Sequence, residues 1–93
     1  MKKKARRNKM KIYGDLLSIL KAEKKSADRI VLTRIKAKMN VPFDRLKNYI
    51  SDLEDLKLIE DQLSLNLTQK GKQYLDEYQK ILDFIERMGV ANR

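Results

Sequence analysis

The sequence contains no cysteine and no histidine. Thiolate nucleophiles, disulfide bonds, imidazole bases and zinc sites with Cys or His ligands are therefore excluded. A Gly-rich phosphate loop is also missing, no nucleophile–base pair can be assembled, and the carboxylates occur mostly as solvated helix charges. We therefore expect no enzymatic activity, and the sequence indicates no cofactor, no metal site and no small-molecule ligand.

Long hydrophobic runs are absent as well. The apolar runs are far shorter than the ~20 residues that a membrane-spanning helix needs. The N-terminal stretch MKKKARRNKMK is basic, but no apolar segment follows it to make a secretory signal. A chain of 93 residues is expected to form one domain with a small core. We expect a soluble, cytoplasmic protein with no membrane partner. Because its core is small, a second protein chain would help to stabilise it.

Positive charge is what the sequence has in excess. The net charge is +9, and the distribution is uneven. Residues 1–47 carry 16 Lys and Arg against 4 Asp and Glu, a balance of +12, whereas residues 48–93 carry 6 against 9, a balance of −3. This asymmetry predicts that one end of the molecule binds a polyanion such as nucleic acid.

Residues 33–59 have the pattern of two short helices joined by a tight turn. Asn40 lies where a residue that tolerates the left-handed region would end the first helix, and Pro42 suits the first turn of the second helix. The spacing predicts helices over residues 33–39 and 43–56. The apolar positions that let the two helices share one core are Ile35, Met39, Val41, Leu46 and Tyr49.

The rest of the chain supplies further elements around this helix-turn-helix. Residues 1–8 read as a basic, flexible arm, and residues 9–22 as a first helix. Residues 23–28 read as a loop and residues 30–32 as a short strand, with Thr33 capping the next helix. An alternative starts that helix at Asp28.

The segment after the helix-turn-helix has the alternation of a hairpin. Leu63, Leu65 and Leu67 alternate with polar residues as a half-buried strand does, with residues 58–60 as the partner strand. Thr68 and Gly89 would cap a final helix over residues 69–88. The predicted fold is mainly α with a small β-hairpin (α+β), a winged helix-turn-helix with a long C-terminal helix.

The last helix carries a heptad-like apolar seam. Tyr74, Tyr78, Ile81, Ile85 and Met88 follow one another at spacings of four and three, and Leu75 and Leu82 widen this stripe. One interpretation packs this stripe on the protein's own first helix. A helix of ~20 residues spans about 30 Å, longer than so small a core needs, which favours an antiparallel homodimer along this helix. We therefore divide the chain into an arm (1–8), a winged helix-turn-helix domain (9–68) and a dimerisation helix with a short tail (69–93).

The string TRIKAKMNVPFDRLKNYISDLEDLKLIE, followed by LTQKGKQYLDEYQKILDFIE, resembles small archaeal winged-helix proteins. Members of that family typically read T-R-I-x-x-x-x-N-L-S-x-x-x-L-x-x-Y-L, then G-L-I-E, then L-T-x-K-G. The resemblance covers roughly residues 10–86 and implies DNA binding, in transcription regulation or chromatin organisation, often with dimerisation through the last helix. Two departures stand out: Pro42 replaces the usual Ser, and the wing has no Lys or Arg.

Recognition helices insert their N-terminal turns into the major groove. Lys47 would donate to guanine acceptors and Asn48 would pair with adenine, whereas Arg45 lies on the flank of the helix, where a phosphate is the nearer partner. Helix 33–39 and the basic arm would contact the phosphate backbone. The predicted DNA-binding residues are Arg6, Arg7, Lys11, Arg34, Lys36, Lys38, Arg45, Lys47, Asn48 and Ser51.

Simpler interpretations remain beside these assignments. Asn48 can be an ordinary solvated residue, Asp44 a stabilising charge at a helix N-terminus, and the arm a solubility tail. The predicted function is a dimeric double-stranded DNA-binding protein, a nucleoid-associated transcription regulator or chromosomal protein. The alternative is a winged-helix module that binds a protein or RNA, which the neutral wing and the half-acidic helix 43–56 favour.

Overall fold

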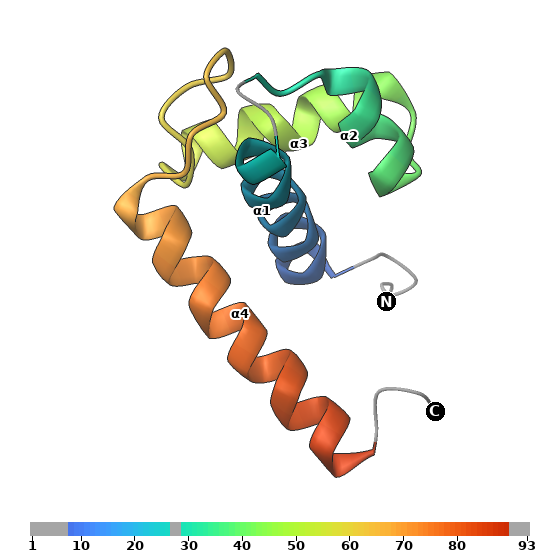
Figure 1. Ribbon diagram of the computed structural model, residues 1–93, viewed down its shortest axis with the longest axis vertical. Coiled ribbons are helices and arrows are strands. Elements are labelled where there is room, and N and C mark those ends of the chain that lie inside the picture. The colour runs from blue at the N-terminus through green and yellow to red at the C-terminus, as the bar shows by residue number, and fades with distance from the viewer. Residues whose placement is uncertain (1–7, 27–28, 90–93) are drawn as a thin grey trace, which may run out of the picture.

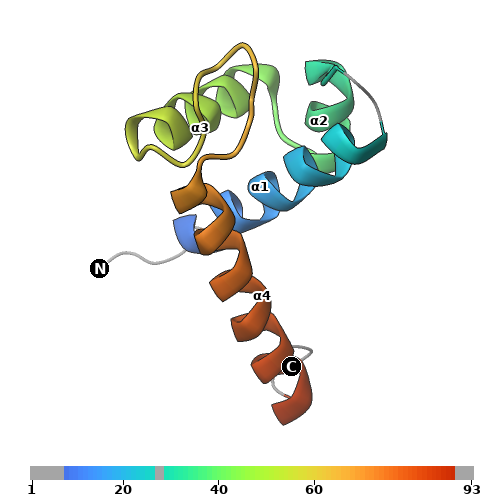
Figure 2. The ribbon, with the colours of Figure 1, turned by 60° about the vertical axis from the view of Figure 1, so that its left-hand side comes forward.

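The computed structural model describes residues 8–26 and 29–89. They form four helices: α1 (Lys9–Ser26), α2 (Leu32–Met39), α3 (Phe43–Asp55) and α4 (Gln69–Met88). The central helix is α1, which packs against α2 and α4, while α2 also packs against α3 (Figure 1). The second half of α4 extends away from the other three helices, as Figure 2 shows from another side.

The core is a single apolar cluster organised around α1. Leu16, Leu17 and Leu20 are completely buried, and they share the interior with Ile35 from α2 and Leu46 from α3. These three α1 residues follow the 3–4 spacing of one helix face, which is why this helix forms the centre of the molecule. None of the helices in residues 8–26 and 29–89 is both long and apolar enough to cross a membrane.

Several expected helix ends are confirmed. Asn40 ends α2 in the left-handed region, at φ 57° and ψ 49°, and its N–H donates to the Lys36 carbonyl at 2.9 Å. Thr68 caps α4 through its hydroxyl oxygen, which accepts from the Gly71 N–H at 3.0 Å, and Gly89 ends α4 at φ 75°. The bounds of α4 are those that the sequence predicts.

The predicted β-hairpin is wrong, and with it the α+β fold class: the described residues contain no strand, and their regular elements are all helices. Residues 56–68 form an irregular loop with one isolated bridge between Ile59 and Leu67. The Asp61 carboxylate accepts from the N–H groups of Leu63 and Ser64, at 2.9 and 2.7 Å, and so winds the chain into a tight turn. Leu65 adopts φ 58°, which breaks the extended alternation and leaves Leu63 95% exposed.

The region before α2 also departs from expectation. No strand forms at residues 30–32; Leu32 already belongs to α2, and Val31 rather than Thr33 is its N-cap. The sequence predicts a loop at residues 23–28, but α1 continues to Ser26, so residues 23–26 are helical. In this turn the Glu23 side chain is held in the interior by two cations of α2. The alternative, a helix that starts at Asp28, is wrong as well, because residues 29–31 are not helical and α2 begins at Leu32.

Phe43, the first residue of α3, and Leu56, the C-cap of α3, are apolar residues that lie outside the core. Phe43 is 39% exposed and Leu56 is 43% exposed. Phe43 is the first residue of α3, where its ring lies beneath the Lys47 ammonium group at 5.6 Å from the ring centroid instead of entering the core. Leu56 follows the last turn, beyond the reach of the helix face that Leu46, Ile50 and Leu53 bury.

Candidate nucleic-acid interface

The outer face of α3 is open to solvent. Leu46, Ile50 and Leu53 point into the core, and this leaves the opposite side of the helix uncovered. Of the predicted DNA-binding residues on α3, Arg45, Lys47 and Asn48 are exposed, and Ser51 is partly buried. Together with exposed Asp44, they form a polar surface on the first two turns of α3.

Two of the acidic residues in the second half of α3 are engaged within the protein. The Tyr13 hydroxyl of α1 donates to Asp52 at 2.7 Å, and Gln62 donates to Glu54 at 2.6 Å. Burial, followed by the hydrogen bond to Asp52, raises the pKa of Tyr13 to about 12. Tyr13 also packs edge-on against Tyr49 of α3, with ring centroids 6.4 Å apart. These contacts fix α3 on α1.

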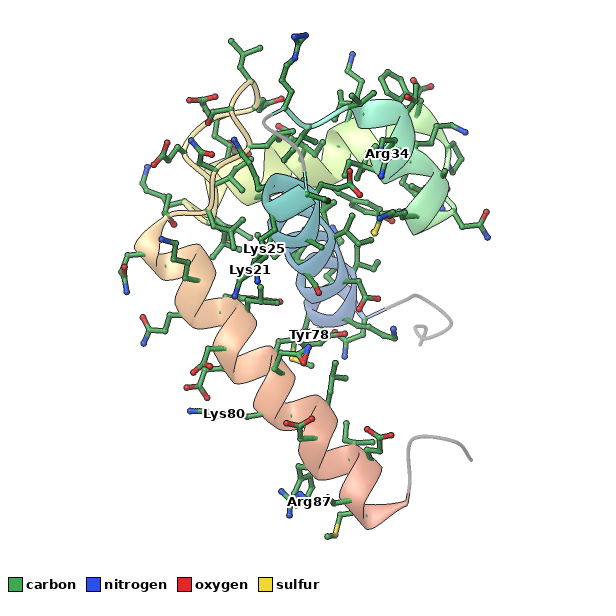
Figure 3. The ribbon with its side chains drawn as sticks, in the orientation of Figure 1. Lys21, Lys25, Arg34, Tyr78, Lys80 and Arg87 are labelled. Atoms are coloured by element: carbon green, nitrogen blue, oxygen red, sulfur yellow. The ribbon has the colours of Figure 1, made fainter. Side chains whose placement is uncertain are left out.

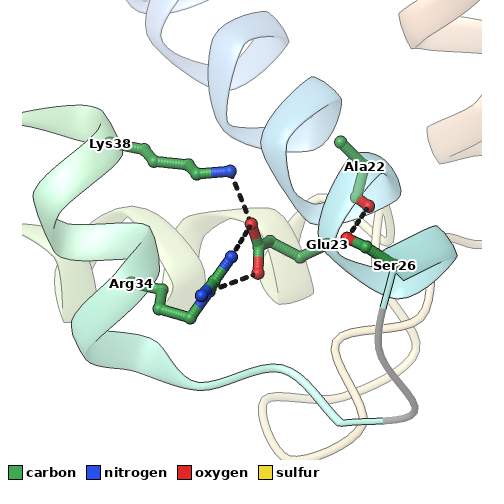
Figure 4. A network of polar contacts seen from close by, with 5 residues as sticks. All are labelled: Ala22, Glu23, Ser26, Arg34 and Lys38. Carbon is green, nitrogen blue, oxygen red and sulfur yellow. Dashed lines mark hydrogen bonds and ion pairs between the residues drawn. The ribbon is translucent and has the colours of Figure 1, made fainter.

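A buried carboxylate links α1 to α2. Glu23 is only 2% exposed, and it accepts from Arg34 Nε at 2.9 Å and from Lys38 Nζ at 2.6 Å (Figure 4). The hydrogen bond from Arg34, followed by the one from Lys38, lowers the pKa of Glu23. The Glu23 carboxylate in turn raises the pKa of Arg34. The structure therefore brings two predicted phosphate contacts together around one anion. We call Glu23, Arg34 and Lys38 the Glu23 triad.

The remaining predicted cations lie in different settings. Lys36 is exposed on α2 and makes no ion pair among the described residues. Lys11 is exposed on the first turns of α1, where it pairs with Asp15 at 3.0 Å. Arg6 and Arg7 lie outside the described residues.

The segment Leu67–Gly71, which carries the L-T-x-K-G pattern, ties α4 to the end of α3. The Thr68 hydroxyl donates to the Lys57 carbonyl at 2.6 Å, and Lys70 donates to the Leu56 carbonyl at 2.8 Å. A Cβ added at Gly71 would lie 2.1 Å from the Leu58 carbonyl oxygen, so only glycine allows this approach. The pattern thus has a structural reason: it clamps the first turn of α4 onto the chain that leaves α3.

The apolar seam of α4 is divided. Its first part packs inside the protein: Leu75 and Tyr78 are buried, Tyr78 points toward α1 in Figure 3, and its hydroxyl donates to Asp15 at 2.9 Å. Burial, followed by this hydrogen bond, raises the pKa of Tyr78 to about 12. Tyr74 is partly buried, and its hydroxyl donates to the Met10 carbonyl at 2.8 Å.

The second part of the seam is uncovered in the single chain. Ile81 is 39% exposed and Met88 54% exposed, while Leu82 and Ile85 are partly buried. Phe84, which is 53% exposed, belongs to this apolar surface, although the heptad pattern does not include it. Its spacing of three from Ile81 and four from Met88 is the signal that could have identified it.

Glu23 is the second functional candidate that the pattern did not reveal. It follows Leu16 by seven residues and Leu20 by three, so it continues the buried face of α1. A charged residue on such a face predicts a cationic partner. In residues 8–26 and 29–89, no cluster of three or more acidic side chains could hold a metal ion.

Comparison with known proteins gives the class of this protein. A family model described as winged helix-turn-helix matches residues 6–86. The match spans well over half of the chain, so the chain belongs to the winged helix-turn-helix family. No curated protein and no solved structure matches the chain. The family is named for a wing, and in this protein the corresponding segment is the loop at residues 56–68 with its single bridge.

Proposed function

We propose that this protein binds double-stranded DNA, with the first turns of α3 in the major groove and α2 on the phosphate backbone. The observation that carries the proposal is the uncovered outer face of α3, where Lys47 and Asn48 are both exposed. Lys suits the acceptors of guanine, and Asn suits the donor–acceptor pair of adenine. Membership of the winged helix-turn-helix family supports the same conclusion.

The charges around α3 support a DNA partner. Arg45 of α3 and Lys36 of α2 are exposed cations, and the N-terminal stretch adds Lys and Arg in excess. Since few donors face the groove and many cations face the backbone, the proposed role is that of a weakly specific transcription regulator or a chromosomal protein.

The proposal includes a homodimer through the distal face of α4. We define this distal face as Ile81, Leu82, Phe84, Ile85 and Met88. The side chains of Ile81, Phe84 and Met88 are exposed, and those of Leu82 and Ile85 are partly buried, on a helix that extends beyond the core (Figure 2). A groove lined by Met10, Tyr74, Ile81 and neighbouring residues continues this surface toward α1. A second copy would cover the distal face and place two α3 helices at a fixed separation.

The test is fluorescence anisotropy with a labelled duplex and a labelled single strand at several salt concentrations. We expect salt-dependent binding that prefers the duplex. Lys47→Ala and Asn48→Ala should each weaken binding to a selected site by a factor of about 5–150, equivalent to about 1–3 kcal/mol. Lys80→Ala on α4 is the matched control and should bind as the wild type does. Equal affinity for duplex and single strand, or no effect of either α3 variant, would contradict the proposal.

A protein-binding role is the second candidate, and one observation favours it. Leu63 at the tip of the loop is 95% exposed, next to a segment without Lys or Arg. An exposed apolar tip in a neutral loop fits a protein surface better than a phosphate backbone. Leu63→Ser would weaken protein capture without changing duplex affinity if this candidate holds.

A further inference from the structure

The Glu23 triad differs from an ordinary surface ion pair in how its members are exposed. The Glu23 side chain is 2% exposed, whereas the side chains of Arg34 and Lys38 are 61% and 47% exposed. The anion is thus enclosed, while large parts of both cationic side chains remain exposed. Figure 4 shows the two cations extending from α2 to the carboxylate at the end of α1.

Both cations keep hydrogen-bond donors that Glu23 does not use. Arg34 donates through Nε at 2.9 Å and Nη2 at 3.5 Å, which leaves part of its five-donor guanidinium without a partner in the triad. Lys38 has three N–H donors and directs its ammonium nitrogen to Glu23 at 2.6 Å. The carboxylate therefore orients both side chains while donors remain for a second anion.

The charge of the triad matches one phosphodiester. Two cations and one carboxylate give a net charge of +1, and a phosphodiester carries −1. Two independent cations would neutralise two phosphates instead. Fixing two long side chains before binding also removes part of the side-chain entropy that binding would otherwise lose.

We propose that the Glu23 triad is a preorganised site for a single DNA backbone phosphate, with Glu23 as its positioning residue. The inference rests on the proposed function and adds a stoichiometry to it. In the helix-turn-helix geometry the first helix crosses the phosphate backbone, and α2 is that helix here. Arg34 and Lys38 then count as one phosphate contact in the salt dependence of binding.

The experiment measures duplex affinity by anisotropy at several salt concentrations for wild type, Glu23→Gln, Lys38→Gln and the double variant. Each neutralised phosphate contributes about 0.9 to the slope of log affinity against log salt. We expect Glu23→Gln to steepen the slope by about 0.9, because it frees a second cation for a second phosphate. Lys38→Gln should flatten it by about 0.9, because the remaining pair is neutral. The double variant, which keeps one uncompensated arginine, should return to the wild-type slope.

Glu86→Gln is the matched control, since it removes one negative charge from an exposed position on α4 and should leave the slope unchanged. Circular dichroism and thermal melting establish that each variant is folded at the temperature of the measurement. If Glu23→Gln alone is unfolded, the double variant, which has the same net charge as the wild type, still tests the inference. Its salt slope is then compared with that of Lys38→Gln.

The outcomes separate this inference from the proposed function. A double variant that keeps the slope of Lys38→Gln would show that the cations act independently, and it would overturn the triad while DNA binding stands. A Glu23→Gln slope that changes no more than that of Glu86→Gln would overturn it too. A wild-type protein that does not bind duplex would overturn both the triad and the function.

Discussion

At the scale of single residues, close contacts explain why a particular residue type occupies a position that the sequence pattern only identifies. Gly71 belongs to a common winged-helix string, and the structure gives the reason: its Cα faces the Leu58 carbonyl. Tyr13 looks like an ordinary core aromatic in sequence, yet its hydroxyl joins α1 to Asp52 of α3. Both residues hold helices together, and both give predictions about stability.

Gly71→Ala should destabilise the fold. The new Cβ would lie 2.1 Å from the Leu58 carbonyl oxygen, which is backbone and cannot rotate away. We expect the free energy of unfolding to fall by about 2–3 kcal/mol, as in other overpacked sites. Urea denaturation followed by circular dichroism measures this change. Lys72→Ala, an exposed neighbour on α4, should stay within about 0.5 kcal/mol of wild type, and a similar loss in both variants would rule out the clash as the cause.

Tyr13→Phe should reduce the loss of stability at high pH. The folded protein raises the pKa of Tyr13 from 10.0 to about 12, because the hydroxyl is buried and donates to Asp52. A pKa raised on folding gives stability that is fully present below pH 10 and is lost as the pH rises toward 12. Urea denaturation of both proteins between pH 8 and 11 should therefore show a shallower decline for the phenylalanine variant. Parallel curves would contradict this account.

At the scale of elements, sequence patterning predicted helices well and the loop poorly. The core helices and the left-handed end at Asn40 follow from local spacing and local backbone preference. The hairpin prediction is wrong because the alternation of three leucines is also compatible with a loop. In that loop the Asp61 carboxylate accepts from two backbone N–H groups. The sequence prediction ends α1 too early because Glu23, which reads as a polar loop residue, is buried against Arg34 and Lys38 of α2. Local signals contain no such tertiary contact.

Helix α4 combines a buried half with an uncovered half, and the two halves predict different effects of the same substitution. Phe84→Glu should abolish the proposed dimer and leave the helices intact, because its ring is 53% exposed in the single chain. Leu75→Glu should instead unfold the protein, because that side chain is 6% exposed inside the core. Sedimentation velocity gives the mass, and circular dichroism the helix content.

Lys80→Gln is the control for this helix. Its side chain is 65% exposed, and it pairs with Asp76 and Glu77 of the same helix, so it should keep the wild-type mass. A wild-type protein that sediments as a single chain at high concentration would rule out the dimer.

At the scale of the whole molecule, charge is separated along the chain. The first 47 residues carry a balance of +12, and the α3–α4 portion from residue 48 onward carries −3. Arg45, Lys47 and the Glu23 triad belong to the positive part, and Asn48 lies directly after it. The distal face of α4 belongs to the negative part, so a dimer through that face would keep the cationic regions available for DNA.

Deleting residues 1–7 should therefore weaken DNA binding mainly through its electrostatic part. This segment contributes five cations, Lys2, Lys3, Lys4, Arg6 and Arg7, and no acid. If all five contact phosphates, the slope of log affinity against log salt should flatten by up to about 4.5, since each phosphate contributes about 0.9. The thermal midpoint should stay close to wild type, because the core cluster begins at Ile12. Replacing the five cations with Gln in the full-length chain is the matched control and should give the same slope as the deletion, because charge rather than chain length is the cause. An unchanged slope in both proteins would assign the segment to solubility and leave α2 and α3 as the whole of the DNA interface.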